Sequence, residues 1–311
     1  MRAAAALAAG LACAILSLLL LDGGLPVWAW LLVLCAWLAA WYAVQRLAPL
    51  AQTTTWRRRG LGLLVPIIFG LTLIYLWEMI TRGFEIPPVL LPAPSAIWDR
   101  IQTSTEMLYA DWWQTFVRAV LTGYVIGCGT AILTAIAIDR SRFLQRGLLP
   151  VGNLVAALPI IGIAPIMVMW FGFDWHSKAA VVVVMVFFPT LTNTVMGLKS
   201  ADRQSLDLMT TYAASYWQTL TKLRLPAAMP FIFNALKICS TLALIGAIVA
   251  EFFGTPIVGM GFRISTEVGR MNIDMVWAEI AVAALAGSVF YGVVALVERA
   301  VTFWHPSIRS A

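Results

Sequence analysis

Residues 61–80 read LGLLVPIIFGLTLIYLWEMI, an apolar run that contains one charged side chain, Glu78. About 20 mostly apolar residues are needed for a helix to cross the hydrocarbon core of a membrane. A membrane β-strand would instead alternate apolar and polar residues over about ten positions. This run therefore predicts a membrane-spanning α-helix.

The rest of the chain has a similar composition. Of its 311 residues, 61% are hydrophobic and 12% are charged, whereas about 25% of residues are charged in soluble domains. This excludes an ordinary soluble enzyme and a disordered chain. The net charge of +6 comes from basic residues between apolar segments, not from one patch interleaved with aromatics, which argues against nucleic-acid binding. We expect an all-α polytopic membrane protein with about eight transmembrane helices, over residues 3–21, 25–44, 61–80, 113–138, 150–171, 179–198, 231–250 and 278–297.

The charges between these segments predict their orientation. If the N-terminus is cytoplasmic, the cytoplasmic segments hold 14 of the 21 Lys and Arg residues but only four of the 15 acidic residues. An excess of Lys and Arg is typical of the cytoplasmic side. We therefore expect both termini in the cytoplasm. We also expect the first helix to be retained, because it is long for a secretory signal and has no clear cleavage site after it.

A basic stretch divides the chain. Residues 45–60 contain Pro49 and the triplet Arg57-Arg58-Arg59, and they predict a cytoplasmic linker. The expected organisation is an N-terminal two-helix transmembrane hairpin with its linker over residues 1–56, followed by a six-helix domain over 57–311.

The longest polar stretch on the predicted cytoplasmic side is 199–230. Its sequence predicts two short helices, the first capped by Ser205 and the second running from Tyr216 to Leu223. A turn at residues 213–215 would join them, and Pro226 and Pro230 would end the second helix. A structured helix pair with exposed aromatic residues indicates a docking element for another protein.

Residues 206–230 resemble the EAA loop of binding-protein-dependent ABC importer permeases. In that family the loop has Glu-Ala-Ala, three residues, Gly, nine residues, an aliphatic residue, one further residue and Leu-Pro. Counted back from Leu225-Pro226, the aliphatic position is Leu223, the Gly position is Ala213 and the Glu position is Asp207. The spacing and the Leu-Pro end match, whereas the Gly and both Ala residues of the family are replaced. An Ala at the Gly position is unsuited to a backbone with positive φ.

Further motifs extend the resemblance over residues 61–305 and make it closest to the nitrate, sulfonate and taurine branch. They occur in the expected order: Trp77-Glu78, Leu91-Pro-Ala-Pro-Ser95, Ala157-Leu-Pro159, Trp170-Phe-Gly172, Phe187-Phe-Pro189, Ala250-Glu-Phe-Phe-Gly254 and Gly259-Met-Gly261.

The resemblance implies a permease subunit that pairs with a second permease chain, two cytoplasmic ABC ATPase subunits and an external solute-binding protein. The partner ATPases would bind ATP and Mg, since no Gly is followed by Lys in this chain and a phosphate-binding Gly-x-x-x-x-Gly-Lys loop is therefore absent. The resemblance also assigns the ATPase-coupling element to Asp207, Ala213, Ala214, Ser215, Trp217, Leu225 and Pro226.

Polar residues within the predicted spans are candidate functional residues, because they are costly in a membrane. Asn234, Lys237 and Thr241 share one helix face, and with Glu251 at the end of that helix they form a candidate translocation path. The alternatives are an interhelical hydrogen-bonding seam and, for Glu251, an exposed helix end. Glu78 and Arg118 form a candidate intramembrane pair, or reach the interface separately. Glu279 is expected at the interface.

The predicted function is alternating-access uptake of a small solute, driven by partner ATPases in a bacterial inner membrane. The branch suggests a small anion such as a sulfonate or nitrate, or a pyrimidine-type or aromatic solute. An ion-driven secondary transporter and a non-transporting scaffold are the alternatives. The sequence shows no catalytic or metal-binding constellation.

Overall fold

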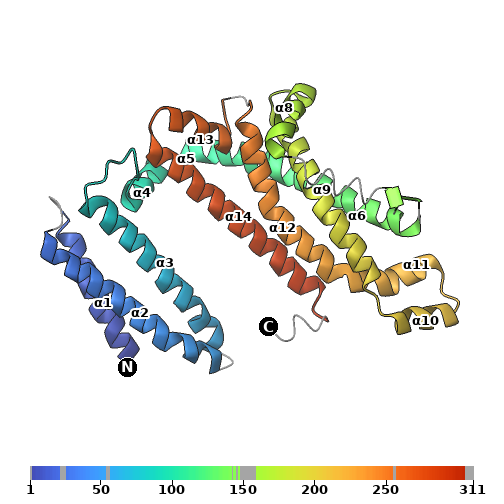
Figure 1. Cartoon of the computed structure of the whole chain (residues 1–311), viewed down its shortest axis with the longest axis horizontal. Coiled ribbons are helices and arrows are strands. Elements are labelled where there is room, and N and C mark those ends of the chain that lie inside the picture. The colour runs from blue at the N-terminus through green and yellow to red at the C-terminus, as the bar shows by residue number, and fades with distance from the viewer. Residues whose placement is uncertain are drawn as a thin grey trace. The chain divides into compact units, whose positions relative to one another are not determined.

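The computed structural model describes residues 2–21, 26–53, 57–141, 143–144, 146–147, 159–254 and 257–304. All regular structure in these residues is helical (Figure 1). The chain forms two compact units: Met1–Thr103 with Arg270–Ala278, and Ser104–Gly269 with Glu279–Ala311. Each unit is described by itself.

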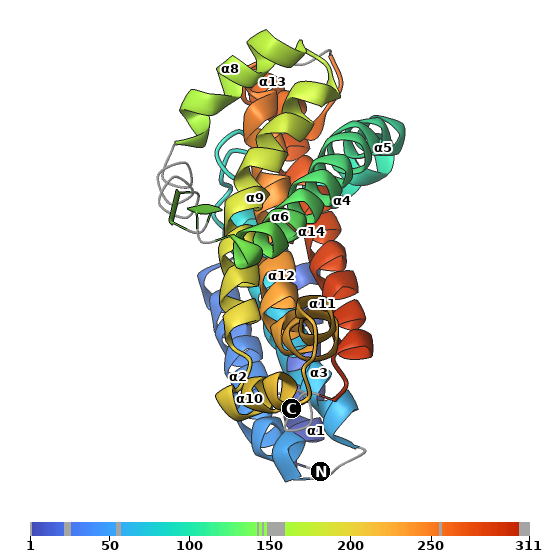
Figure 2. The same cartoon turned by 90° about the vertical axis from the view of Figure 1, so that its right-hand side faces the viewer.

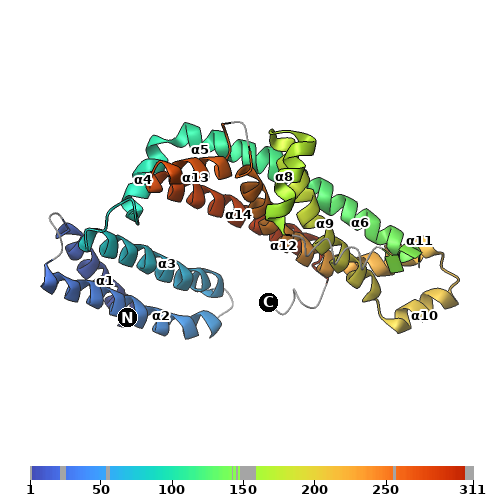
Figure 3. The same ribbon diagram turned by 45° about the horizontal axis from the view of Figure 1, so that its top comes forward.

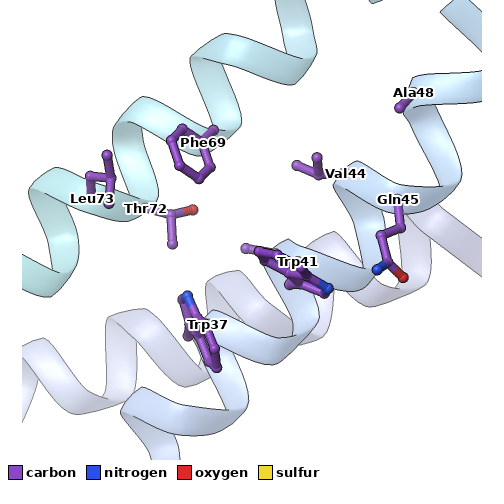
Figure 4. A pocket seen from close by; sticks show the side chains of 9 residues that line it. Trp37, Trp41, Val44, Gln45, Ala48, Phe69, Thr72 and Leu73 are labelled. Atoms are coloured by element: carbon purple, nitrogen blue, oxygen red, sulfur yellow. The ribbon is translucent and has the colours of Figure 1, made fainter.

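Helices α1, α2 and α3 make up most of the first unit. They span Arg2–Leu19, Trp30–Thr53 and Arg57–Gly83, and a short α4 follows at Pro94–Thr103. The Ser17 hydroxyl lies 2.6 Å from the Tyr75 hydroxyl, which joins α1 to α3. A groove of about 290 Å³ runs between α2 and α3, with Trp37 and Trp41 on one side and Phe69 and Leu73 on the other (Figure 4).

The predicted linker is shorter than expected. Helix α2 continues to Thr53 and contains Pro49, and α3 begins at Arg57. Proline removes one backbone hydrogen bond, and here the loss falls in the last turns of the helix. The remaining linker residues, 54–56, lie outside the described part of the chain.

The second unit contains the other helices. Two of them, α5 (Thr105–Trp112) and α6 (Thr122–Arg140), are joined by the π-helical segment η2 (Trp113–Leu121). The remaining elements are α8 (Ile160–Phe171), α9 (Trp175–Lys199), α10 (Arg203–Thr211), α11 (Tyr216–Thr219), the π-helical η3 (Leu220–Arg224), α12 (Leu225–Glu251), α13 (Met260–Gly269) and α14 (Ile273–Val301), whose first residues belong to the first unit.

The core of the second unit lies where α9 packs against α6 and α12, which run beside it (Figure 2). Small residues permit this close contact. A Cβ on Gly123 would lie 2.6 Å from the Val182 Cβ, and one on Gly127 would lie 2.4 Å from the Val186 Cγ2. Residues 123 and 127 therefore form a small-residue packing face.

Among the described residues, six helices are long and apolar enough to cross a membrane. The other two predicted spans are shorter here: the apolar part of α1 is Ala5–Leu19, and α8 has 12 residues. Part of the predicted 150–171 span, residues 150–158, lies outside the described chain. The six helices are Val27–Pro49, Leu63–Gly83, Thr105–Arg140, Trp175–Lys199, Tyr216–Glu251 and Ile273–Val301.

Candidate functional site

Helices α10 and α11 form an exposed pair at one end of the second unit, beyond the end of α9 (Figures 1 and 3). Neither helix has a buried residue. Asp207 is exposed on α10, and Leu208 and Trp217 expose more than half of their surface. The first helix starts earlier than predicted, because Asp202 and not Ser205 is its N-terminal cap residue.

The turn between the two helices is the one that the sequence predicts. Helix α10 ends in a Schellman motif, in which Ala213 N–H donates to the Thr210 carbonyl and Ala214 N–H donates to the Met209 carbonyl, both at 2.9 Å. Ala213 has a φ of +50°. Glycine is the usual residue at this position of the motif, since a side chain disfavours positive φ.

Ser215 starts α11 with a capping box. Its hydroxyl accepts the Gln218 backbone N–H, and the Gln218 side chain accepts the Ser215 backbone N–H at 2.8 Å. Two N–H groups that would otherwise lack partners at the helix start are thereby satisfied.

The prolines after α11 do not end the helix, contrary to the sequence prediction. The helical path continues from α11 through η3 into α12. Pro226 lies in the first turn of α12, where its missing N–H costs little, and the wider π-turns of η3 precede it. Only Pro230 lies inside the helix. The helix pair is thereby joined directly to a membrane-spanning segment.

Arg224 anchors this junction to α6. Its Nη1 and Nη2 donate to Asp139 Oδ2 and Oδ1 at 2.6 and 2.7 Å, and its Nε donates to the Leu198 carbonyl at 3.1 Å. The Tyr216 hydroxyl also donates to Asp139, at 3.0 Å. One carboxylate at the end of α6 therefore holds both ends of the α11–η3 segment. The Arg140 guanidinium lies over the Tyr216 and Trp217 rings, at 5.3 and 6.0 Å from their centroids.

The predicted polar stripe on α12 is partly exposed. Asn234 and Thr241 are exposed, and Lys237 Nζ lies 2.6 Å from Glu298 Oε2 of α14. The positive charge of Lys237 therefore has a partner within the chain, as in the interhelical seam. Next to the stripe, an apolar groove of about 610 Å³ is lined by residues of α12, α13 and α14.

Glu251 is buried and not an exposed helix end, because it binds the start of α13. Its Oε1 accepts the Thr115 hydroxyl at 2.8 Å, and its Oε2 accepts the Gly261 backbone N–H at 2.7 Å. Thr115 in turn accepts the Met260 N–H at 2.8 Å. A Cβ on Gly261 would lie 2.2 Å from the Ile248 carbonyl oxygen, so glycine is required there.

Asp111 of α5 completes this arrangement. Its Oδ1 accepts the Gly259 N–H at 2.6 Å, and its Oδ2 accepts Arg263 Nε at 2.8 Å. Helix N-termini favour negative charge because their first N–H groups lack partners within the helix. We call Asp111, Thr115, Glu251 and Arg263 the α13 cluster. Glu279 is also fully buried beside it, so its side chain is not exposed at the protein surface, and its expected position at the membrane interface stays a prediction.

Lys178 of α9 holds a neighbouring loop. The side chain is buried, and its Nζ donates to the backbone carbonyls of Phe173 and Gly254. Asp174, the N-cap of α9, accepts the Trp175 N–H at 2.7 Å, and this hydrogen bond lowers the pKa of Asp174 below its usual value.

Glu78 and Arg118 have other partners in the structure. Glu78 accepts the Ser95 backbone N–H at 2.9 Å and the Ser95 hydroxyl at 2.6 Å, and it pairs with Arg82 at 3.3 Å. Arg118 donates to Gln114 Oε1 at 3.2 Å. A direct Glu78–Arg118 pair stays a prediction.

Sequence reasoning did not find Asp111, Asp139, Arg263 or Glu298 as site residues. Asp139 and Arg224 are 85 positions apart, and Asp111 and Arg263 are 152 apart. The only signal was an acidic or basic residue close to the end of an apolar segment, which is also typical of a helix end facing water.

These features define a polytopic helical membrane protein with an exposed helix pair joined to a spanning helix. Residues 123–303, more than half of the chain, match the family of binding-protein-dependent transport system inner membrane components. The chain belongs to this family, and it is therefore a multi-pass transport component of the inner membrane and not itself an enzyme.

Three relatives illustrate the similarity. A probable ABC transporter permease protein of Haemophilus influenzae is 31% identical over 216 residues, which cover 70% of this chain and 87% of the relative. The formylaminopyrimidine transport permease protein ThiX of Halalkalibacterium halodurans is 30% identical over 247 residues, 79% of this chain and 98% of the relative. The putative aliphatic sulfonates transport permease protein SsuC of Bacillus subtilis is 27% identical over 251 residues, which cover 79% of this chain and 88% of the relative.

Proposed function

We propose that this chain is the permease subunit of an ABC importer. With a second permease chain it forms a path for a small solute, which opens to one side of the membrane at a time. The observation that carries this proposal is the exposed α10–α11 pair, because it is preorganised by two capping motifs and continues without a break into α12.

The coupling element of this proposal consists of Asp207, Ala213, Ala214, Ser215, Trp217, Leu225 and Pro226. Asp207 and Trp217 lie on the exposed surface and contact an ATPase subunit. Ala213, Ala214 and Ser215 set the angle between α10 and α11. Leu225 and Pro226 begin α12, so a displacement of the pair moves that helix. Two such ATPases bind ATP and Mg and hydrolyse the ATP.

The proposed topology places α10 and α11 in the cytoplasm, together with both termini. The chain crosses the membrane eight times, with a two-helix hairpin in residues 1–56 and six crossings in 57–311. The excess of Lys and Arg on one side supports this orientation. The α13 cluster then lies on the outer side of the membrane, the side on which an external solute-binding protein docks.

The proposed path includes Asn234, Lys237, Thr241 and Glu251, the last at its outer end. Relatives are named for formylaminopyrimidine, riboflavin, aliphatic sulfonates, bicarbonate and taurine. The substrate is a small solute of this range, an anion or a pyrimidine-type compound. Since Glu298 already pairs with Lys237, an anionic substrate would have to compete for that lysine.

Co-purification tests this proposal. The full chain, expressed with its neighbouring genes, is captured in mild detergent, and its partners are identified by mass spectrometry. We expect two copies of an ATPase subunit, and ATP turnover that rises when an external binding protein is added. Recovery of the chain alone, without ATP turnover, would favour a carrier driven by an ion gradient.

A further inference from the structure

Glu279 is a buried carboxyl group to which the described part of the chain gives no hydrogen-bond donor. The residue has 0% exposure, and neither carboxyl oxygen accepts a hydrogen bond from the described part of the chain. It lies on α14 near the start of that helix. Buried carboxylates elsewhere in this unit, such as Asp111 and Glu251, each accept two or more hydrogen bonds.

The charged neighbours of Glu279 come from three other helices. Asp111 of α5, Glu251 of α12 and Arg263 of α13 act on it, and Lys178 of α9 acts on Glu251. Both positive groups are already engaged, Arg263 by Asp111 and Lys178 by two backbone carbonyls.

Without Glu279 the neighbouring groups already carry at least as many negative as positive charges. Asp111 and Glu251 face Arg263 and Lys178, and Asp174 also acts on Lys178. An ionised Glu279 would add a third, uncompensated negative charge beside two others, with no donor to stabilise it. Burying an unpaired charge costs several kcal/mol, and a nearby like charge adds to this cost. The neutral acid avoids both costs, and its O–H is a donor that the neighbouring Asp111 carboxylate can accept.

We propose that Glu279 is a proton-binding site of the α13 cluster. The cluster is assembled while Glu279 carries its proton. When Glu279 loses the proton at high pH, repulsion from Asp111 and Glu251 separates α14 from the cluster and releases the start of α13.

Release of α13 would reduce uptake at high external pH, and this consequence rests on the proposed function. The proton site itself does not, so it is tested on the purified full chain without any transport measurement. If the proton site is found but uptake does not fall at high external pH, the result counts against the proposed function and not against the proton site.

Hydrogen–deuterium exchange of residues 257–269 provides the readout, because the N–H groups of Gly259, Met260 and Gly261 are held by the cluster. Wild type is compared with Glu279→Gln and Glu279→Met at each pH, which cancels the intrinsic pH dependence of exchange. Glu106→Gln is the matched control, since Glu106 is an exposed carboxylate on the same α5 helix as Asp111.

At about pH 6 we expect wild type and both Glu279 variants to exchange this segment equally slowly. At about pH 9 wild type should exchange it at least about tenfold faster than either variant, because proton linkage lowers stability up to about tenfold for each pH unit over which the closed cluster keeps a proton that the open state has lost. Glu106→Gln should behave as wild type at both pH values.

Two outcomes would overturn the proposal. One is fast exchange of both Glu279 variants at about pH 6, since a neutral side chain would then fail to replace Glu279. The other is an identical response of wild type and both variants to pH.

Discussion

Arg224 and Asp139 form a two-pronged ion pair, with Nη1 2.6 Å from Oδ2 and Nη2 2.7 Å from Oδ1. The pair fastens the segment that follows the exposed helix pair to the end of α6. The two side chains are only 20% and 7% exposed. A displacement of α10 and α11 would therefore act on the end of α6 as well as on α12.

Removing one partner of this pair should weaken the junction. Asp139→Asn or Arg224→Gln leaves an unpaired and largely buried charge, which we expect to cost about 3 kcal/mol of unfolding free energy, the lower end for a buried pair. The double variant should lose less than the sum of the single variants, because the pair is coupled. Unfolding in detergent measures this. Arg203→Gln, at an exposed position of α10, is the control, and strictly additive losses would show that the pair is unimportant.

Ala213→Gly should stabilise the turn. Ala213 has a φ of +50°, a conformation that costs a residue with a side chain about 1 kcal/mol. Ala214→Gly is the matched control, since Ala214 is the next residue but has no positive φ; it should destabilise by about 0.5 kcal/mol. Amide exchange of residues 203–224 distinguishes the two. Equal effects of both substitutions would contradict the strain assigned to Ala213.

Gly261→Ala should disrupt the α13 cluster. The added Cβ would meet the backbone oxygen of Ile248 at 2.2 Å, and backbone cannot move aside as a flexible side chain does. We expect a loss of about 3 kcal/mol, at the upper end for overpacking. Gly269→Ala, on the same helix with nothing within 4 Å, should be tolerated. Thermal unfolding of both variants checks this, and equal midpoints would contradict the account.

Lys237 and Glu298 provide a test of the charge of the substrate. Lys237→Met and Glu298→Met should each cost about 3 kcal/mol of unfolding free energy, since each leaves its partner unpaired, and the double variant should recover most of the stability. Uptake by the double variant then separates two roles. If Lys237 binds an anionic substrate, uptake is lost in the double variant as well. If Lys237 serves only the seam, uptake returns with stability.

The sequence predicted local features of the fold better than distant contacts. The long apolar segments and the turn at residues 213–215 depend on residues close in the chain, so spacing was sufficient. The effect of Pro226 was misjudged, because the π-turns of η3 have no known sequence signal. The residues that surround Glu251, Glu279 and Lys237 could not be predicted either, for a different reason.

The α13 cluster shows that reason. Glu251 and Glu279 lie at the ends of apolar segments, where an acidic residue usually faces water. Their burial depends on Asp111, Thr115 and Arg263, which come from distant parts of the sequence. No periodicity or motif in a single sequence brings these residues together. The Lys237–Glu298 pair was hidden in the same way.

The coupling role of the α10–α11 pair is tested most directly by Asp207→Arg. The measurement is ATP turnover and solute uptake by the assembled transporter, with and without binding protein. Because Asp207 is exposed, the variant should insert and fold as wild type. We predict that it loses binding-protein-stimulated turnover and uptake by at least about tenfold, the effect of roughly 1.4 kcal/mol. Unchanged turnover and uptake in this variant would contradict the account.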